Sequence, residues 1–303
     1  MKLQIRHETL YKYAGTVSHS VNQLCIIPRD TLYQQCLNNK LRVDPVPENV
    51  YTWTDSFGNT QAHFSIEESH SKCTVESVSL VETSSAQMPA LPSDESMWQS
   101  KENLRNDKSD DGLFASKCLL PSKHVKRLSG TQDLTSELLN KSGAVTDFAE
   151  QLMNWIYKEF EYDPAFSTVV TTGQKAWDAK RGVCQDFAHV ALAILREAGI
   201  PARYVSGYLE TLPPPGEKKL QGSDASHAWF SVYCPNHGWY DFDPTNNKRP
   251  DKQYVTTAWG RDYSDVAPLK GVVYGGGSQT VSVSVDVNRF DGALYTVDDE
   301  KQD

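Results

Sequence analysis

Apolar and polar residues alternate along the first part of the chain, up to about residue 83. Short runs rich in Val, Ile, Thr and Tyr follow one another, among them LQIRHETLYKY, QLCIIPRD, AHFSIEE and CTVESVSLVET. Turn-forming stretches such as DPVPEN and SFGN separate these runs. A period of two is typical of half-buried strands, and several closely spaced strands favour an antiparallel sandwich. We therefore predict an N-terminal β-sandwich domain over residues 1–84.

The pattern changes beyond this domain. The next stretch contains SSAQMPALPSDESMWQSKENLRNDKSDDG, so we expect residues 85–144 to form a solvated connection with short helices. Further on, apolar residues recur at steps of three and four over 145–156 and again over 187–198, which predicts two amphipathic helices. Gly199 and Pro201 mark the end of the second helix.

Strand patterns return after the second helix, in ARYVSGYL, HAWFSVY, GWYDFDP and TVSVSVDV. Helices followed by an antiparallel sheet indicate an α+β fold. We predict that residues 145–290 form this second domain and that residues 291–303 are a polar tail.

Composition and charge narrow the classes of partner. The chain has 303 residues, of which 39% are hydrophobic and 23% charged, as in ordinary globular proteins. Its net charge is -9 and no basic stripe stands out, so neither nucleic acid nor an anionic membrane is an expected partner. The first residues lack the apolar core of a signal peptide, and no run is long enough to span a bilayer. Six scattered cysteines suit free thiols in a reducing compartment, so we expect a cytoplasmic protein.

One cysteine stands at an unusual place. In RGVCQDFAHVALAILREAGIP, Cys184 begins the second predicted helix, two residues after Gly182. The positive end of the helix dipole and the free N–H groups at this point stabilise a thiolate, and the same N–H groups can hold an oxyanion. Cysteine is also a common small buried residue. The position of Cys184 alone is therefore compatible with two roles, that of a buried packing residue and that of a reactive thiol.

A nucleophilic cysteine needs a base, and the base needs an orienting group. The alternation in SHAWFSVY places His227 on one face of its strand, and GWYDFDP places Asp241 and Asp243 together on one face of the next. Pairing of these strands would bring the histidine opposite a carboxylate, which holds an imidazole in position. The spacing does not choose between Asp241 and Asp243.

Three blocks, GVCQDFAHVALAILREAGIPARYVSGYL, SHAWFSVY and GWYDFDPT, resemble the signature blocks of the transglutaminase-like superfamily of papain-like cysteine peptidases. HETLYKY, VNQLCIIPRD and the DSFGN turn resemble the β-rich N-terminal domain of its bacterial members. The resemblance implies a papain-like catalytic domain in which Cys184 is the nucleophile and His227 the base. It also implies that Asp243, which precedes Pro-Thr, is the orienting acid.

The resemblance further implies a cysteine-dependent hydrolase, a peptidase or amidase, that acts on peptide or amide bonds through a thioester and needs no cofactor. The alternatives are acyl transfer to an amine, as in a protein-glutamine transglutaminase, and a catalytically inactive binding protein. In the family a second oxyanion donor lies upstream of the cysteine, and Tyr162 in FEYDPAF is the candidate here. The segment TLPPPGEKKLQGSDAS, residues 211–226, is either a specificity loop beside the cleft or an ordinary solvated loop.

A metal site is not expected. Cys234 and His237 have the spacing of a half-site and His227 lies nearby, but no second half-site is present and structural zinc takes four ligands. We expect His189 to be structural and Asp186 to interact with the helix dipole rather than to act as an acid. The four histidines of the first domain form no ligand set: His7, His19, His63 and His70.

Overall fold

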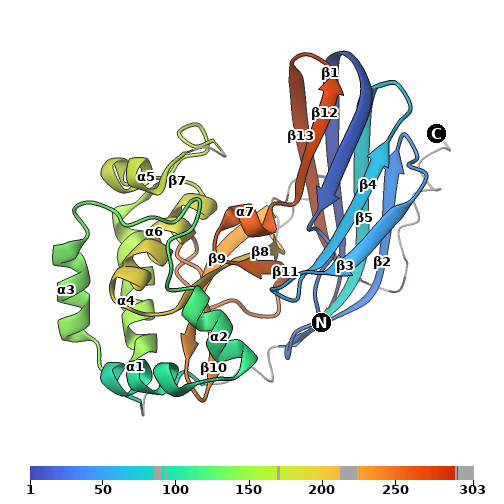
Figure 1. The fold of residues 1–303 in the computed structure, drawn as a ribbon. Coiled ribbons are helices and arrows are strands. Elements are labelled where there is room, and N and C mark those ends of the chain that lie inside the picture. Colours follow the sequence, from blue (N-terminus) through green and yellow to red (C-terminus); the bar gives the residue numbers. More distant parts are fainter. Residues whose placement is uncertain are drawn as a thin grey trace, which may run out of the picture.

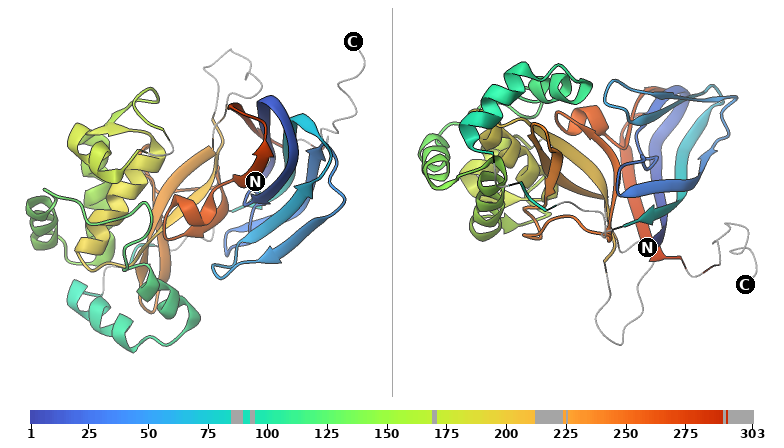
Figure 2. Two further views of the ribbon diagram at one scale, coloured as in Figure 1. Left: turned by 45° about the horizontal axis from the view of Figure 1, so that its top comes forward. Right: turned by 90° about the horizontal axis from the view of Figure 1, so that it is seen from below.

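The computed structural model describes residues 1–84, 90–92, 95–168, 171–211, 224, 226–290 and 292. It has two antiparallel sheets, and most of the helices cover one side of the second sheet while the first sheet lies on its other side (Figures 1 and 2). The chain is therefore of mixed α and β structure. None of the helices in these ranges is both long and apolar enough to cross a membrane.

The first sheet is curled and contains seven strands (Figure 1). Its strands are β1 (Lys2–Leu24), β2 (Gln34–Asp44), β3 (Val50–Thr54), β4 (Thr60–Ile66), β5 (His70–Thr83), β12 (Leu269–Gly275) and β13 (Gln279–Arg289). The first half of β1 pairs with β5 and β13, whereas its second half pairs with β4 and β12. Because β1 belongs to both halves, the sheet curls around a core that includes Leu24, Phe64 and Val75.

The last two strands differ from the prediction, which assigned residues up to 290 to the second domain. In the structure β13 pairs with β1 from Leu3↔Arg289 to Tyr13↔Gln279, and β12 pairs with β1 from Val17 to Leu24. Residues 269–289 therefore complete the N-terminal sheet. The alternating pattern of TVSVSVDV indicates a strand, but it carries no information about which strand will be its partner.

Seven helices lie within the described ranges. They are α1 (Met97–Asn106), α2 (Asp110–Lys117), α3 (Gln132–Lys141), α4 (Val145–Glu159), α5 (Gly173–Ala179), α6 (Cys184–Glu197) and α7 (Tyr263–Val266). The helical patterns over 145–156 and 187–198 correspond to α4 and α6. Their apolar faces pack together in one core, where Phe148 and Leu152 of α4 join Phe187 and Ile194 of α6.

The second sheet has four antiparallel strands in the order β10-β9-β8-β11. They are β8 (Ala202–Leu209), β9 (Ser226–Cys234), β10 (Gly238–Phe242) and β11 (Tyr254–Gly260). Ala228, Phe230 and Val232 of β9 join the core that contains α6. The alternate residue Trp229 belongs to a separate cluster with Tyr254 on the outer face of the sheet.

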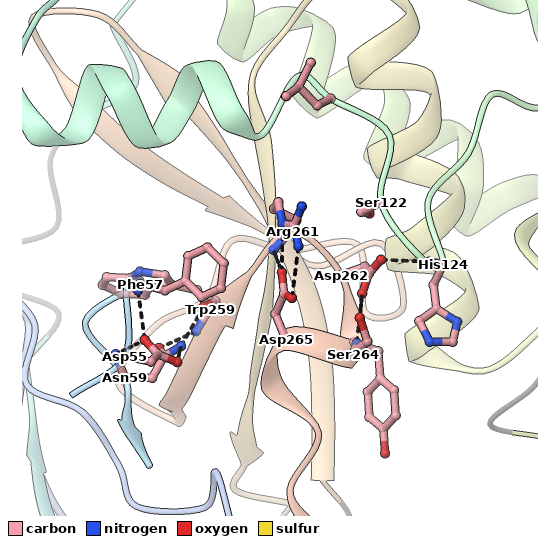
Figure 3. A network of polar contacts seen from close by, with 12 residues as sticks. Asp55, Phe57, Asn59, Ser122, His124, Trp259, Arg261, Asp262, Ser264 and Asp265 are labelled. Carbon is pink, nitrogen blue, oxygen red and sulfur yellow. Dashed lines mark hydrogen bonds and ion pairs between the residues drawn. The ribbon is translucent and has the colours of Figure 1, made fainter. Parts of the chain in front are cut away.

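The first domain packs against this outer face. Leu3 and Ile5 share an apolar cluster with Tyr208 and Val255. Asn59 pairs with the backbone of Trp259 on β11, accepting from its N–H at 3.0 Å and donating to its C=O at 2.8 Å (Figure 3). In the same way Gln34 accepts from Thr256 N–H and donates to Thr256 C=O, both at 2.8 Å. Because β11 is an edge strand, these two amides occupy backbone groups that another strand would otherwise use.

Candidate active site

Cys184 is the first residue of α6, and the local chain explains how it comes to be there. The preceding residue, Val183, is extended, and its N–H donates to the carboxylate of Asp186 at 2.9 Å. A side chain at Gly182 would place its Cβ 2.7 Å from that carboxylate, so only glycine lets the chain enter the helix without a clash. The hydroxyl of Ser167 donates to Asp186 as well. Cys184 is thereby held at the helix start with a partly exposed side chain.

His227 lies at the start of β9, directly across from Gly207 of β8. Its Nε2 is 2.7 Å from Oδ2 of Asp243. The imidazole centroid is 5.9 Å from the ring centroids of both Trp229 and Tyr254. Aromatic contacts and a carboxylate therefore restrain the imidazole.

Asp243 follows β10 and its side chain is fully buried. Besides His227, its Oδ2 accepts from the hydroxyl of Tyr254 at 2.6 Å and from Nδ2 of Asn246 at 2.7 Å, and its Oδ1 accepts from the backbone N–H of Thr245 at 2.8 Å. Burial raises the pKa of Asp243, but hydrogen bonds and the charge of His227 outweigh burial and hold it below its usual value. A carboxylate with this set of donors stays ionised.

The structure distinguishes the two carboxylates that spacing alone left open. Asp241 lies opposite Ser231 in the β9–β10 register, further along β9 from His227. Of these two carboxylates, Asp243 is the one that makes a hydrogen bond to His227 in the described part of the chain.

The imidazole connects the carboxylate to the thiol. Burial alone lowers the pKa of His227, but the hydrogen bond to Asp243 and the interaction with the neighbouring Cys184, together with the charges of both groups, raise it to about 10. Because Asp243 occupies Nε2, the ring nitrogen left for Cys184 is Nδ1. The thiol, imidazole and carboxylate thus form one connected series in which the imidazolium form of His227 is favoured.

Tyr162 lies beside this series. It belongs to β6 (Glu161–Tyr162), which pairs in parallel with β7 (Arg181–Gly182), immediately before α6. Its ring packs edge-on against Phe187, and its side chain is 52% exposed. Burial and the charge of Cys184 both raise the pKa of Tyr162. The phenol is therefore near the sulfur, while its role as an oxyanion donor stays a prediction.

Two residues of the site were missed in the sequence. Asn246 follows Asp243 by three residues, so the turn DPTN carried a local signal for it, because an aspartate and an asparagine at this spacing often share a turn. Tyr254 lies on β11 and donates a hydrogen bond to Asp243, but no local sequence pattern indicates this contact. Its place depends on how β11 is brought to the end of β10.

The remaining candidates lie apart from the series. His189 is buried, stacks on His124 at 5.5 Å and accepts from Tyr263 N–H at 3.2 Å, and burial lowers its pKa to about 3. Cys234 is a buried free thiol. Within the ranges that the structure describes, no group of three potential metal ligands is found. Most of the segment 211–226 and almost all of the tail 291–303 lie outside the described residues.

The raised pKa of His227 predicts a dependence of stability on pH. The folded-state value of about 10 lies above the ordinary 6.5. The contribution of the imidazolium is therefore complete below about pH 6.5 and is lost as the pH rises towards 10. We expect the free energy of unfolding in urea to fall more steeply over this range in the wild type than in His227→Gln. Equal slopes in the two proteins would contradict the prediction.

A thiol at a helix start, an imidazole and a buried carboxylate in series are typical of proteins with thiol-dependent acyl chemistry. The chain belongs to the transglutaminase-like superfamily: residues 132–244 match the transglutaminase-like superfamily core, and residues 3–82 match the bacterial transglutaminase-like N-terminal region. Both matches confirm the resemblance predicted from the sequence blocks.

Several proteins are similar to this chain. An uncharacterized protein of Mycobacterium tuberculosis is 34% identical over 296 residues, covering 96% of this chain and 94% of its own. A protein-glutamine gamma-glutamyltransferase of Pseudomonas aeruginosa is 36% identical over 105 residues. This shorter match covers 33% of this chain and 16% of the relative. The crystal structure of a proposed cysteine protease from Cytophaga hutchinsonii has the same fold, with a TM-score of 0.73 over 97% of this chain and 92% of that one, at 23% identity.

Proposed function

We propose that this protein is a cysteine-dependent hydrolase, a peptidase or amidase, in which Cys184, His227 and Asp243 form a catalytic triad. The observation that supports the proposal most directly is the position of His227, which bonds Asp243 through Nε2 and lies close enough to Cys184 for the thiol to raise its pKa. Such a histidine can take the thiol proton and remain oriented by the carboxylate.

In this proposal the sulfur of Cys184 attacks the carbonyl carbon of an amide while His227 holds the thiol proton. The backbone N–H groups at the start of α6 stabilise the developing oxyanion, with Tyr162 as the proposed second donor. Collapse of the tetrahedral species breaks the C–N bond, and His227 gives its proton to the departing amine. Water, deprotonated by His227, then attacks the thioester and releases the acid and the free thiol. No step needs a cofactor.

The proposal predicts selective alkylation of Cys184 at neutral pH. Burial raises the pKa of Cys25, Cys118 and Cys234 to about 12 and that of Cys73 to about 11, with nearby charges and hydrogen bonds as smaller causes. Iodoacetamide should therefore modify Cys184 first, which peptide mass spectrometry can follow over time.

Cys36 is the matched control, because its side chain is also of intermediate exposure, while burial and the charge of Asp30 raise its pKa. We expect Cys184 to react at least about tenfold faster than Cys36 in the folded protein. His227→Gln should remove most of this difference. Equal rates at the two cysteines in the wild type would argue against an activated nucleophile.

Acyl transfer to an amine is the second candidate function, and the similarity to a protein-glutamine gamma-glutamyltransferase favours it. Transfer needs a passage that admits an alkyl amine beside the thioester, usually with apolar or aromatic walls. Trp229, one candidate for such a wall, is fully buried against Tyr254. Water needs no passage of this kind, so we propose hydrolysis as the main outcome.

The ratio of products separates the two functions. A substrate that acylates Cys184 should give predominantly free acid, even as a primary amine is raised into the millimolar range, because water reaches the thioester without a binding site. Chromatography of the acid and amide products measures this ratio. Predominant amide formation at millimolar amine would favour the transferase instead.

A further inference from the structure

A cavity lies between the two domains, on the outer face of the second sheet. Its volume is about 380 Å³. Leu32 and Tyr33 of the first domain and Arg203, Trp239 and Asp241 of the sheet are among the residues that line it. Neither Cys184 nor His227 does, but Trp229 and Tyr254, which contact the imidazole of His227, also line it, so the cavity adjoins the candidate active site without containing its thiol.

Arg203 is the unusual residue of this cavity. Its side chain is only 5% exposed, and its guanidinium lies between two indoles, 3.6 Å from the ring centroid of Trp259 and 4.2 Å from that of Trp239. Within the described residues the guanidinium of Arg203 has no hydrogen-bond or ion-pair partner, and its buried Nε has no acceptor. Cation–π stacking compensates for part of the lost hydration, but it leaves the in-plane N–H donors unused.

Stacking on both faces leaves only the edge of the guanidinium free. That edge carries donors in a planar fork, which matches the two oxygens of a carboxylate. A ligand that satisfies these N–H donors must therefore carry an anionic group that approaches in the plane of the guanidinium.

The other charges of the cavity exclude a simple oxyanion. Asp111, Asp241 and Asp251 also line it, and Arg203 is the one arginine or lysine among the described lining residues, although Asp251 is paired with Lys248 at 3.6 Å. Arg203 and Asp241 lie on either side of β9, both opposite Ser231, and the carboxylate of Asp241 has no hydrogen-bond partner among the described residues. A phosphate dianion would be repelled by these carboxylates, whereas an ammonium group would be attracted.

We infer that the cavity binds a zwitterionic amino compound, an α-amino acid or a short peptide. Its carboxylate meets the edge of Arg203, its ammonium faces Asp241, and its apolar part contacts Trp239 and Tyr254. The volume lies at the lower end of the range of small-molecule sites, roughly 300–1,000 Å³, and fits a ligand of this size. The inference does not depend on the proposed catalytic function.

Isothermal titration calorimetry on the full-length Cys184→Ala protein tests the inference without turnover. The probes are L-leucine, L-phenylalanine and the dipeptide leucyl-leucine, with N-acetyl-L-leucine, L-leucinamide and inorganic phosphate as comparisons. We expect saturable binding of a zwitterionic probe, and binding at least about tenfold weaker when either charge is removed. Comparison of the free amino acids with the dipeptide shows whether the cavity prefers an α-amino acid or a short peptide.

Substitutions of the cavity residues test whether the zwitterion binds at this site. Arg203→Met and Asp241→Asn should each weaken binding of the zwitterion at least about tenfold, and Arg203→Lys should not restore it because lysine lacks the planar fork. Arg105→Met, at an exposed arginine of α1, is the matched control and should bind normally. If Arg203→Met does not fold, Asp241→Asn remains a test. Absence of saturable zwitterion binding, undiminished binding by folded Asp241→Asn, or tighter binding of phosphate would overturn the inference.

Discussion

Replacing Asp243 by asparagine should lower the turnover of an amide substrate by about 10⁴-fold, the loss known for the equivalent change in a serine protease triad. An amide cannot carry the charge that stabilises the imidazolium of His227, and its NH₂ group can reverse the hydrogen bond to Nε2. Loss of this carboxylate should also lower the pKa of His227 from about 10, because a hydrogen bond and a charge that raise it are removed. Steady-state kinetics measures the first effect and an NMR titration of the imidazole the second.

Asp262→Asn is the control for the loss of a buried carboxylate. Asp262 is fully buried and accepts from the backbone N–H groups of His124 and Ser264, so its replacement should affect folding stability rather than chemistry (Figure 3). Asp241→Asn should reduce turnover far less than Asp243→Asn. A larger loss at Asp241 would reverse the assignment of the two carboxylates.

The second large effect is expected on stability, from Gly207→Ala. A Cβ at Gly207 would lie 2.0 Å from the carbonyl oxygen of Val255 and 2.7 Å from the indole of Trp229. Relief would require β8 to separate from β11 where these strands pair. We expect the free energy of unfolding to fall by about 3 kcal/mol or more. Because Gly207 lies across from His227, turnover of the folded fraction should fall as well.

Gly15→Ala is the matched control for this substitution. Gly15 also lies in a strand, and the nearest atom to its Cβ would be 3.6 Å away, which is ordinary van der Waals contact. Urea denaturation of both variants compares the two sites directly. A loss of less than about 1 kcal/mol at Gly207 would show that β11 moves aside easily.

The sequence predicts the parts of the site that depend on local pattern. Cys184 was identifiable because a helix start shows in the apolar period and in the glycine before it, and His227 because a strand alternates. The contribution of Tyr254 was not predictable, since it comes from a strand whose neighbours depend on the whole sheet. The family resemblance favours Asp243 over Asp241, and in the structure Asp243 is the carboxylate bonded to His227.

For the fold as for the site, the sequence predicts the elements that depend on neighbouring residues but not the contacts between residues distant in the chain. Helices α4 and α6 and most strands were expected from periodicity, because each depends on residues within a few turns of the chain. No local sequence pattern predicts the cavity around Arg203, because Trp239, Trp259 and Tyr33 meet there only after the domains have packed. The partner of β13 was likewise set by contacts distant in sequence, where Val285 and Val287 pack with Leu3 and Ile5.

The pairing of β1 with β12 and β13 has a consequence for synthesis of the chain. The first strand to leave the ribosome must wait for partners that lie more than 240 residues later, between Leu269 and Arg289. Until then one long edge of β1 stays open, and an open edge can pair with another chain. The N-terminal domain therefore cannot complete its sheet during translation of its own segment, and a protein cut short before residue 269 would expose a strand that invites aggregation.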